Sequence, residues 1–563
     1  MGRSDSLYSD LMGRVPTRHH PLEQVPGTST PIMLPYVTSI CYHWYYSEKG
    51  VTDMKKSLAF VLSLLVSVAA IASYLNVAMI GEVRSLNPYF VSSSAERQLI
   101  GYLYETLLTT QGGMTVGAIA ESWEVSTPER SMTVTLKERE FHDGTPLTAE
   151  DVAFSFNMTV EKRLPMGPLL AWFAGAEVIN EHTVKLNFRV LNSSVIDMIP
   201  VAIPIIPKAR WKDVERPMEF SNLEDPVGTG TFKFSRSTPQ TVTFDAFDKH
   251  PDAPEYISGI VFHLVQDQTM GFLGLVRGDY DYIAWDLDPV LATQILQTPS
   301  RYPDMNVAIT EGINVTSVMF NHRREPMNDL NFRKAIQYAV NYPEIIERVY
   351  QGYASEASLG MIPSTAEYVY DGSLGAPVLD VDLARHYLEQ SDYDGRKLRI
   401  LVSSTKEQME VAEYLKLYLG RIGIEIEVDV LGHEAVTSRL QSADFDMAIT
   451  GYTIGAQPSM LFYHMHTSRG EIEDGRVAGY NYGGISIPEI DAVLNRIWMS
   501  FEETALKQAF VDLQRMIAEF VPAVPICVPN RVQAYSTKRF TNWQISDVDG
   551  VFTSETLRVL QPK

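Results

Sequence analysis

Three short stretches, widely spaced along the chain, define turns, helix starts and a strand. They are residues 141–152 (FHDGTPLTAEDV), 225–234 (DPVGTGTFKF) and 331–341 (NFRKAIQYAVN). In the first, Gly144 suits a turn with positive φ, and Thr148 with Asp151 predicts a capping box that opens a helix. In the second, Gly228 and Gly230 predict a tight turn into an alternating strand. In the third, apolar residues spaced by four predict a helix, so the chain mixes helices and strands.

The glycines at 228 and 230 also raise the question of a nucleotide-binding loop, and the surrounding residues argue against one. The third glycine of GxGxxG and the Gly-Lys-Ser/Thr of a P-loop are both missing. The segment also leads into a strand, whereas a nucleotide loop opens a helix. We therefore interpret Gly144, Gly228 and Gly230 as structural turn residues.

The three stretches, taken in this order, resemble the peptide/nickel class (family 5) of extracellular solute-binding proteins, which serve ATP-binding-cassette (ABC) importers. The resemblance runs from about Leu75 to the C-terminus. It implies an α/β fold of the two-lobed, type II periplasmic-binding-protein kind, with an extra inserted subdomain and a hinge of two chain crossings. The implied divisions are 73–105, 226–305 and 533–563 for lobe I, 106–225 for the inserted subdomain, and 306–532 for lobe II.

Local patterns also support an α/β fold. Residues 398–402 form an apolar strand, residues 411–422 carry one helical face, and residues 424–430 alternate between apolar and acidic side chains. This order predicts a strand–helix–strand unit with a parallel, right-handed crossover. We also expect a helix over 98–108. The prolines of 522–529 exclude a helix there and favour an extended hinge strand.

The segment 54–72 has the three parts of an export signal. Two lysines lead an uncharged apolar run, and a small-residue A-x-A site precedes Ser73. The apolar run is shorter than the roughly 20 residues of a membrane span, although an uncleaved membrane tether is the alternative. Residues 1–53 precede this signal and are interpreted as a leader of doubtful translation, with the start at Met54. The mature protein then begins at Ser73 and is exported to the periplasm or the cell exterior.

Charge and cysteine content limit the partners. The formal net charge is −22 and the pI is near 5.0, so the surface repels nucleic acid and we expect none to bind. Only Cys41 and Cys527 are present, so a mature chain without Cys41 has no intramolecular disulfide.

No pattern for catalysis or metal binding is complete. His464-Met-His466 provides two ligands where a metal site needs three or four, and His433 lacks the second histidine of HExxH. No GxSxG motif occurs. We therefore expect neither a metal nor a cofactor, and a binding protein rather than an enzyme. An exported hydrolase is a weaker alternative.

Candidate ligand-binding residues follow two strands of the predicted second lobe, because ligands of open α/β lobes bind beyond the carboxyl ends of the strands. The candidates are Ser404, Thr405 and Lys406 after the first strand, and Tyr452, Thr453 and Gln457 after the second. In dipeptide-binding proteins of the family it resembles, the first loop supplies a cation for the peptide carboxylate. Lys406 takes that role here or is a solvated residue of a first helical turn.

The second loop departs from the family pattern. In the dipeptide-binding proteins it supplies an aspartate for the peptide amine, but this chain has Gln457 before Pro458 and no carboxylate between Gly451 and His464. A buried ammonium needs a paired negative charge, whereas hydroxyl, amide and aromatic groups suit neutral ligands. Oligopeptide or dipeptide is the leading ligand from the resemblance, and oligosaccharide is the alternative.

Three further residues are weaker candidates for ligand contact. Trp285 ends a predicted strand at a position that resembles the lining of the cleft, and core packing is the alternative. Glu82 and Tyr89 follow the first predicted strand.

The resemblance implies capture by lobe closure. Ligand contacts made by both lobes exist only in the closed form, so ligand shifts the population to that form. A monomer then delivers its ligand to an ABC permease with its ATPase subunits. A sensor that docks on a membrane receptor shares the fold and is a lower alternative.

Overall fold

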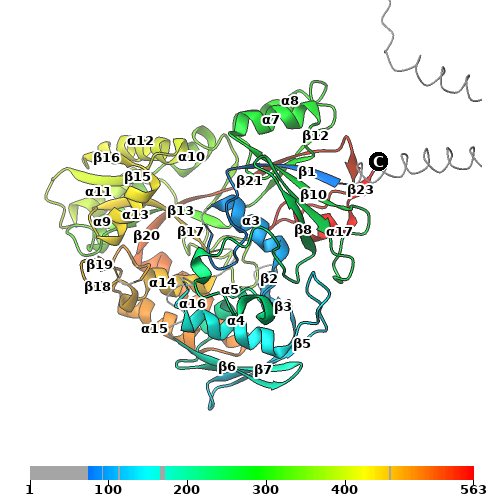
Figure 1. Cartoon of the computed structure of the whole chain (residues 1–563). Coiled ribbons are helices and arrows are strands. Elements are labelled where there is room, and N and C mark those ends of the chain that lie inside the picture. Colours follow the sequence, from blue (N-terminus) through cyan, green and yellow to red (C-terminus); the bar gives the residue numbers. More distant parts are fainter. Residues whose placement is uncertain (1–73, 92, 112–113, 165–171, 455–457, 478) are drawn as a thin grey trace, which may run out of the picture. The chain divides into compact units, whose positions relative to one another are not determined.

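The computed structural model describes residues 74–91, 93–111, 114–164, 172–454, 458–477 and 479–563 (Figure 1). The chain divides into two units, Met1–Ala69 and Ala70–Lys563, and the described residues all belong to the second. The predicted leader 1–53, the export signal 54–72 and Cys41 lie outside them. Within this part of the chain, every helix is too short or too polar to span a bilayer.

Seven strands from separate parts of the chain form one sheet (Figure 1). In spatial order they are β12 (Met305–Thr310), β21 (Arg531–Ser536), β11 (Tyr282–Ile283), β1 (Tyr74–Ile80), β10 (Gly259–Val265), β9 (Thr241–Ala246) and β8 (Phe232–Ser237). β1 runs parallel to β10 and β11, whereas β21 runs antiparallel to both of its neighbours. Fully buried residues such as Val77, Phe244 and Phe262 make this sheet the core of what we call the first lobe. Its other elements are the helices α3 (Ser94–Leu103), α7 (Gln268–Arg277), α8 (Pro289–Gln297) and α17 (Ser554–Val559), and a two-stranded sheet of β22 (Phe540–Thr541) and β23 (Gln561–Pro562).

Six strands form a second sheet, the core of the second lobe. In spatial order they are β14 (Ala354–Glu356), β20 (Ala523–Pro529), β13 (Asn314–Phe320), β17 (Met447–Thr453), β15 (Leu398–Ser403) and β16 (Ile426–Leu431). The predicted strand–helix–strand unit is β15, α12 (Lys406–Gly420) and β16, and its parallel pairing is confirmed. The remaining elements of this lobe are α9 (Leu330–Ala339), α10 (Tyr342–Arg348), α11 (Val381–Glu389), α13 (His433–Gln441), η3 (Pro458–Met460), α14 (Leu461–Met465), η4 (Thr467–Arg469), β18 (Ile472–Glu473), β19 (Arg476–Val477), α15 (Pro488–Met499) and α16 (Glu503–Phe520).

The chain passes between the two sheets twice. β12 belongs to the first sheet and β13 to the second, with residues 311–313 between them. β20 belongs to the second sheet and β21 to the first, with Asn530 between them. The predicted lobe boundaries at 305/306 and 532/533 therefore fall inside strands β12 and β21. The extended conformation predicted for 522–529 is confirmed by β20.

A further sheet lies in the segment 106–225, which we call the inserted segment. β4 (Ala120–Ser126), β5 (Ser131–Leu136), β7 (Thr183–Phe188) and β6 (Phe173–Asn180) form it in that order, and all pairs are antiparallel. Helix α4 (Ala149–Glu161) packs against β6 and β7 and begins with the predicted capping box, in which Asp151 accepts from the Thr148 N–H at 3.0 Å. The other elements are β2 (Leu108–Gln111), β3 (Met114–Gly117), α5 (Ser193–Ala202), α6 (Lys208–Trp211) and η2 (Pro217–Glu219).

The glycines at 228 and 230 allow a close approach between segments. A Cβ at Gly228 would lie 2.0 Å from the Leu103 carbonyl oxygen, and one at Gly230 would lie 2.2 Å from that of Tyr102. Both carbonyls belong to the end of α3. By contrast, Gly144 has a φ of +85°, as its turn requires.

The prediction of a helix over 98–108 is wrong in its second half. Helix α3 ends at Leu103, Tyr104 is extended, and Leu108 begins β2. The Gly230 N–H donates to the Leu103 carbonyl at 3.0 Å, so the backbone of 228–230 occupies the space that another helical turn would need.

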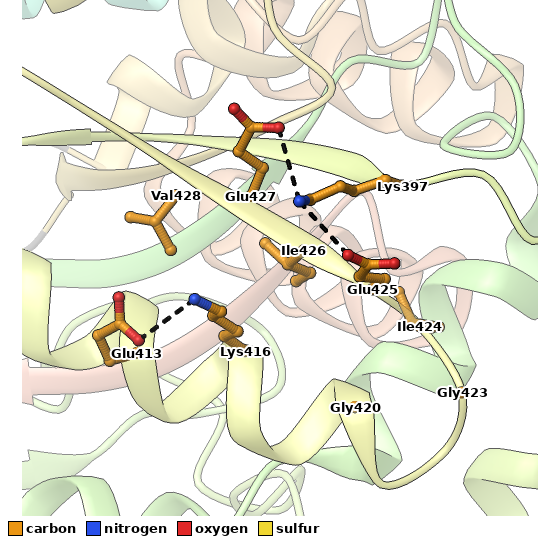
Figure 2. Close-up of a pocket in the computed structure, with 10 residues that line it drawn as sticks. All are labelled: Lys397, Glu413, Lys416, Gly420, Gly423, Ile424, Glu425, Ile426, Glu427 and Val428. Atoms are coloured by element: carbon orange, nitrogen blue, oxygen red, sulfur yellow. Dashed lines mark ion pairs between the residues drawn. The ribbon is translucent and has the colours of Figure 1, made fainter.

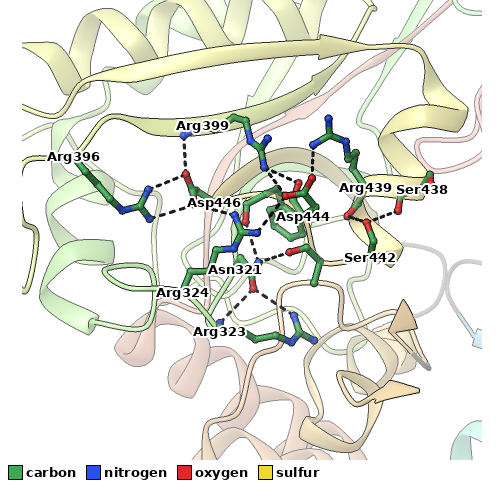
Figure 3. Close-up of polar contacts among 12 residues, drawn as sticks. Asn321, Arg323, Arg324, Arg396, Arg399, Ser438, Arg439, Ser442, Asp444 and Asp446 are labelled. Atoms are coloured by element: carbon green, nitrogen blue, oxygen red, sulfur yellow. Dashed lines mark hydrogen bonds and ion pairs between the residues drawn. The ribbon is translucent and has the colours of Figure 1, made fainter. Parts of the chain in front are cut away.

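A network of charged residues holds the starts of β15 and β17 together (Figure 3). It consists of Arg324, Arg396, Arg399, Arg439, Asp444 and Asp446, and we call it the arginine brace. Asp446 accepts from Arg324 and Arg396 at 3.2–3.3 Å and from the Arg399 N–H at 2.9 Å. Burial opposes the ionisation of Asp446, but the arginines outweigh it and the pKa of Asp446 is lowered. The hydrogen bond from Arg399 likewise lowers the pKa of Asp444.

Candidate ligand-binding site

The two loops predicted to bind the ligand lie at the same edge of the second sheet, because β15 and β17 are parallel neighbours. After β15, the residues Ser404, Thr405 and Lys406 are exposed. The Ser404 N–H donates to the Leu431 carbonyl at 2.9 Å, and α12 begins at Lys406. Lys406 makes no ion pair with any described residue, so its ammonium is open to solvent.

Tyr452 and Thr453 end β17 on opposite sides of the strand. Thr453 is exposed, whereas Tyr452 is 1% exposed and its ring meets the His464 ring edge-to-face at 5.0 Å between centroids. Among the described residues, the Tyr452 Oη has no hydrogen bond of standard geometry. Burial raises the pKa of Tyr452, so the phenol keeps its proton and can donate. Gln457 lies outside the described residues.

An aromatic cluster forms where the helices after β17 meet the inserted segment. It consists of Phe462, Tyr463, His466 and Trp498 of the second lobe and Trp172 of the inserted segment, and we call it the aromatic cluster. Phe462 stacks on His466 at 4.5 Å between ring centroids, and its ring meets that of Trp498 in a tilted arrangement at 4.1 Å. Trp172 reaches Trp498 at 5.4 Å and Tyr463 at 6.2 Å.

A hydrogen bond close to the cluster also joins the inserted segment to the second lobe. Ser193 at the start of α5 donates to the Ile497 carbonyl of α15 at 2.8 Å. This bond is buried. The inserted segment therefore contacts the second lobe through both polar and aromatic groups.

Several buried polar atoms of the aromatic cluster have no hydrogen-bond partner of standard geometry in the described part of the chain. They are Tyr463 Oη, His466 Nε2 and Trp498 Nε1. An unpaired buried polar group costs about 1–3 kcal/mol, so ligand or water is expected beside these atoms.

The sequence did not predict the aromatic cluster beside the candidate loops. Trp172 is distant in sequence from the helices that it contacts, and no local pattern encodes that contact. One signal was available: no Asp or Glu occurs between Asp446 and Glu471, a run that contains two histidines and three other aromatic residues.

The three weaker candidates for ligand contact make contacts with other parts of the protein. Trp285 is half-buried and packs its ring against α7. Glu82 is exposed and pairs with Arg84 at 2.6 Å. Tyr89 is 3% exposed and packs edge-to-face on Trp211 at 5.7 Å. These contacts favour packing for Trp285 and Tyr89 and a surface ion pair for Glu82.

His464 and His466 have different surroundings. His464 meets Tyr452 and Tyr480, whereas His466 stacks on Phe462. Burial lowers the pKa of His464 to about 4, so its imidazole is neutral at pH 7. Within the described residues, no group of three potential metal ligands occurs.

A surface groove lies between α12 and the edge strand β16 (Figure 2). None of the predicted site residues lines it. Lys397 pairs with Glu425 at 3.3 Å and with Glu427 at 3.9 Å, and Glu413 with Lys416 at 3.7 Å. Because these charges pair within the groove, we assign no ligand to it.

Comparison with known proteins identifies the family. Residues 115–474 match the family described as bacterial extracellular solute-binding proteins, family 5 middle. The chain belongs to this family. Its members are binding proteins, so membership agrees with the expectation that this family 5 protein is not an enzyme.

Relatives of this family 5 protein match most of its length. It is 21% identical to the peptide transport periplasmic protein SapA of Salmonella typhimurium, over 81% of its own chain and 86% of that relative. It is also 21% identical to the oligopeptide-binding protein AppA of Bacillus subtilis, again over 81% and 86%. The solved structure of AppA with a nonapeptide superposes with a TM-score of 0.67 at 19% identity, covering 87% of this chain and 98% of that one. This likeness concerns the fold, and it confirms the predicted α/β periplasmic-binding-protein class.

Proposed function

We propose that this chain is the substrate-binding component of an ABC importer and that it captures oligopeptides or dipeptides outside the membrane. The observation that carries the proposal is the family match over residues 115–474. The names of SapA and AppA, which refer to peptide transport and oligopeptide binding, support peptide as the ligand. The permease and its ATPase subunits are the partners that this role requires, and a monomer is sufficient for it.

Ligand capture by lobe closure fits the connections between the sheets. We place the hinge at residues 311–313 and at Asn530, where the chain changes sheet. Ser404, Thr405, Lys406, Tyr452 and Thr453 are the proposed ligand-facing residues of the second lobe, with Gln457 as a further candidate. Ligand contacts made by both lobes would exist only in the closed form, so ligand favours closure.

The proposed site of action is the periplasm or the cell exterior. SapA is named as a periplasmic protein, and the segment 54–72 has the pattern of an export signal. Cleavage after Ala72 releases the protein, whereas retention of the signal tethers it to the membrane.

Oligosaccharide is the second candidate ligand, and one observation favours it. The region from Gly451 to His464 has no carboxylate to pair with a peptide amine. Hydroxyl and aromatic groups in this region suit a neutral sugar.

Native mass spectrometry of purified residues 73–563, followed by denaturing release of bound molecules, tests the proposal. A heterogeneous set of peptide masses is the expected result. Masses that differ by hexose or pentose units would assign the site to sugars instead. A protein that carries nothing and retains no member of a random pentapeptide library would contradict the peptide proposal.

A further inference from the structure

Arg469 is a half-buried arginine whose side chain lies among aromatic rings of the aromatic cluster. Its guanidinium carbon is 5.2 Å from the ring centre of Trp172, 5.6 Å from that of Phe462 and 5.8 Å from that of Tyr463. Trp172 comes from the inserted segment, and the other two come from the second lobe. The guanidinium is therefore held at the contact between the two.

No carboxylate balances this guanidinium. Within the described residues, Arg469 has no ion pair and no side-chain hydrogen bond, and its Nε is buried without a partner. The undescribed positions after residue 73 include no Asp or Glu. The side chain is half-buried, and its Nε–H is buried without an acceptor, which costs about 1–3 kcal/mol. An anionic acceptor beside the guanidinium would remove that cost and pair its charge.

The polar neighbours of Arg469 in the aromatic cluster are donors. Trp498 Nε1 can only donate, and Tyr463 keeps its proton because burial raises its pKa. Both atoms are buried without a partner among the described residues. The nearby carboxylate of Asp491 is engaged, since it accepts from the Thr467 N–H at 3.0 Å and lies 4.0 Å from His466 Nε2. A cation surrounded by free donors selects an acceptor group with negative charge.

We propose that Arg469 binds the carboxylate of the ligand, with Tyr463 and Trp498 as further donors and Trp172 as the wall supplied by the inserted segment. This inference rests on the proposed peptide ligand and names the group by which it is held. Planar guanidinium matches a carboxylate with two parallel hydrogen bonds, which an ammonium such as that of Lys406 cannot form. It assigns to Arg469 the role that the family resemblance gave to Lys406.

The test compares random pentapeptide libraries with free C-termini and with C-terminal amides, retained by the 73–563 protein and measured by native mass spectrometry. For the wild type we expect the free-acid library to bind about 10- to 100-fold more tightly, the range of a charge-assisted hydrogen-bond pair. In Arg469→Gln that preference falls below about 3-fold, while binding of the amidated library stays within about 3-fold of wild type. Arg476→Gln, an exposed arginine of the β18–β19 hairpin, is the matched control and keeps the wild-type preference.

The outcomes separate this inference from the proposed function. A wild-type protein that retains both libraries equally would leave peptide binding in place and overturn the carboxylate site. Equal loss of both libraries in Arg469→Gln would show that the arginine only holds the lobes together, and would also overturn it. Retention of neither library by the wild type would refute the peptide function and this inference with it. If Arg469→Gln does not fold, Arg469→Lys serves instead, with the free-acid preference reduced but still present.

Discussion

The starts of β15 and β17 carry the arginine brace, whereas Arg469 and the aromatic cluster follow the opposite end of β17. In the brace, four arginines share two aspartates, and each guanidinium has a carboxylate partner (Figure 3). Beyond the other end, Arg469 has no partner of that kind among the described residues. Arginines at the starts of β15 and β17 thus pair with carboxylates of the protein, whereas the arginine that follows the end of β17 has no such pair among the described residues.

This difference assigns the two groups of arginines within one lobe to different roles, folding and binding. Hydrogen-bond donors that are paired inside the protein stabilise the native state and cannot also bind a ligand. Donors that stay unpaired lower the stability of the free protein and gain their partner only on binding, the usual compromise at a functional site. Variants at the two ends should therefore affect different properties.

The largest effect is expected from Asp446→Ala, which removes the most buried carboxylate of the brace, 8% exposed. Arg324, Arg396 and the Arg399 N–H lose their shared acceptor, so we expect the free energy of unfolding to fall by about 2–4 kcal/mol in urea titrations. Ligand affinity of the folded protein should not change. The control Asp512→Ala removes a carboxylate of an exposed pair and should cost less than about 1 kcal/mol. Equal losses in both variants would contradict the role of the brace.

Lowering the pH should destabilise the arginine brace and the surroundings of His464 in different pH ranges. The pKa values of Asp444 and Asp446 are lowered in the folded state, so the brace contributes above about pH 4 and is lost as pH falls further. The pKa of His464 is about 4 in the folded state and about 6.5 in the unfolded chain. As the pH falls, the unfolded chain is therefore protonated at His464 before the folded protein is. Stability should therefore fall by about 1 kcal/mol per pH unit between these values because of His464.

The variant His464→Asn isolates this contribution. Denaturant titrations from pH 7.5 to 3.5 should show a flatter decline between pH 6.5 and 4.5 than in wild type, with the same loss below about pH 4. An unchanged slope in the upper range would remove His464 from the explanation.

Tyr452→Phe tests a single hydroxyl without a standard hydrogen bond, near the carboxyl end of β17. The Oη has no standard hydrogen bond within the described residues, so stability should change by less than about 0.5 kcal/mol. If a ligand accepts from it, affinity falls roughly 3- to 10-fold, the value of one hydrogen bond. Phenylalanine is needed because alanine would leave a cavity at this buried position. Calorimetric titration with a released ligand measures the change, and an unaltered affinity would exclude the hydroxyl from the site.

The smallest effect is expected from Lys406→Gln. The side chain is exposed and makes no ion pair with a described residue, so stability should stay within about 0.5 kcal/mol of wild type. The preference for free-acid peptides should also persist, because Arg469 supplies the cation. Loss of that preference would return the carboxylate to Lys406.

Local chemistry made much of the fold predictable. The capping box at Thr148 and Asp151, the parallel pairing of β15 with β16 and the extended 522–529 segment each depend on residues close in sequence. Helix α3 was predicted five residues too long because its end is set by the distant backbone of 228–230. Neighbouring residues carry no information about that contact.

The candidate site was harder to predict for the same reason. Strand ends identified Ser404, Lys406 and Tyr452, because a period-2 pattern locates them. The setting of Arg469 depends on Trp172, a contact between segments that no periodicity connects. Burial also could not be predicted for Tyr452, because strand alternation predicts two faces without showing which of them the following helices cover.

The position of β21 in the first sheet has a consequence for synthesis. β1 is synthesised before the other strands of this sheet, yet β21, which is synthesised last of them, fills the place between β11 and β12. All strands of the second sheet precede β21, so the second lobe can assemble while the first still lacks a central strand. A nascent or truncated chain that stops before Arg531 would display open edges on β11 and β12, which are templates for association with other chains. The sheet that contains the first described strand is thus completed only after the second sheet, and its solubility depends on the residues from Arg531 onward.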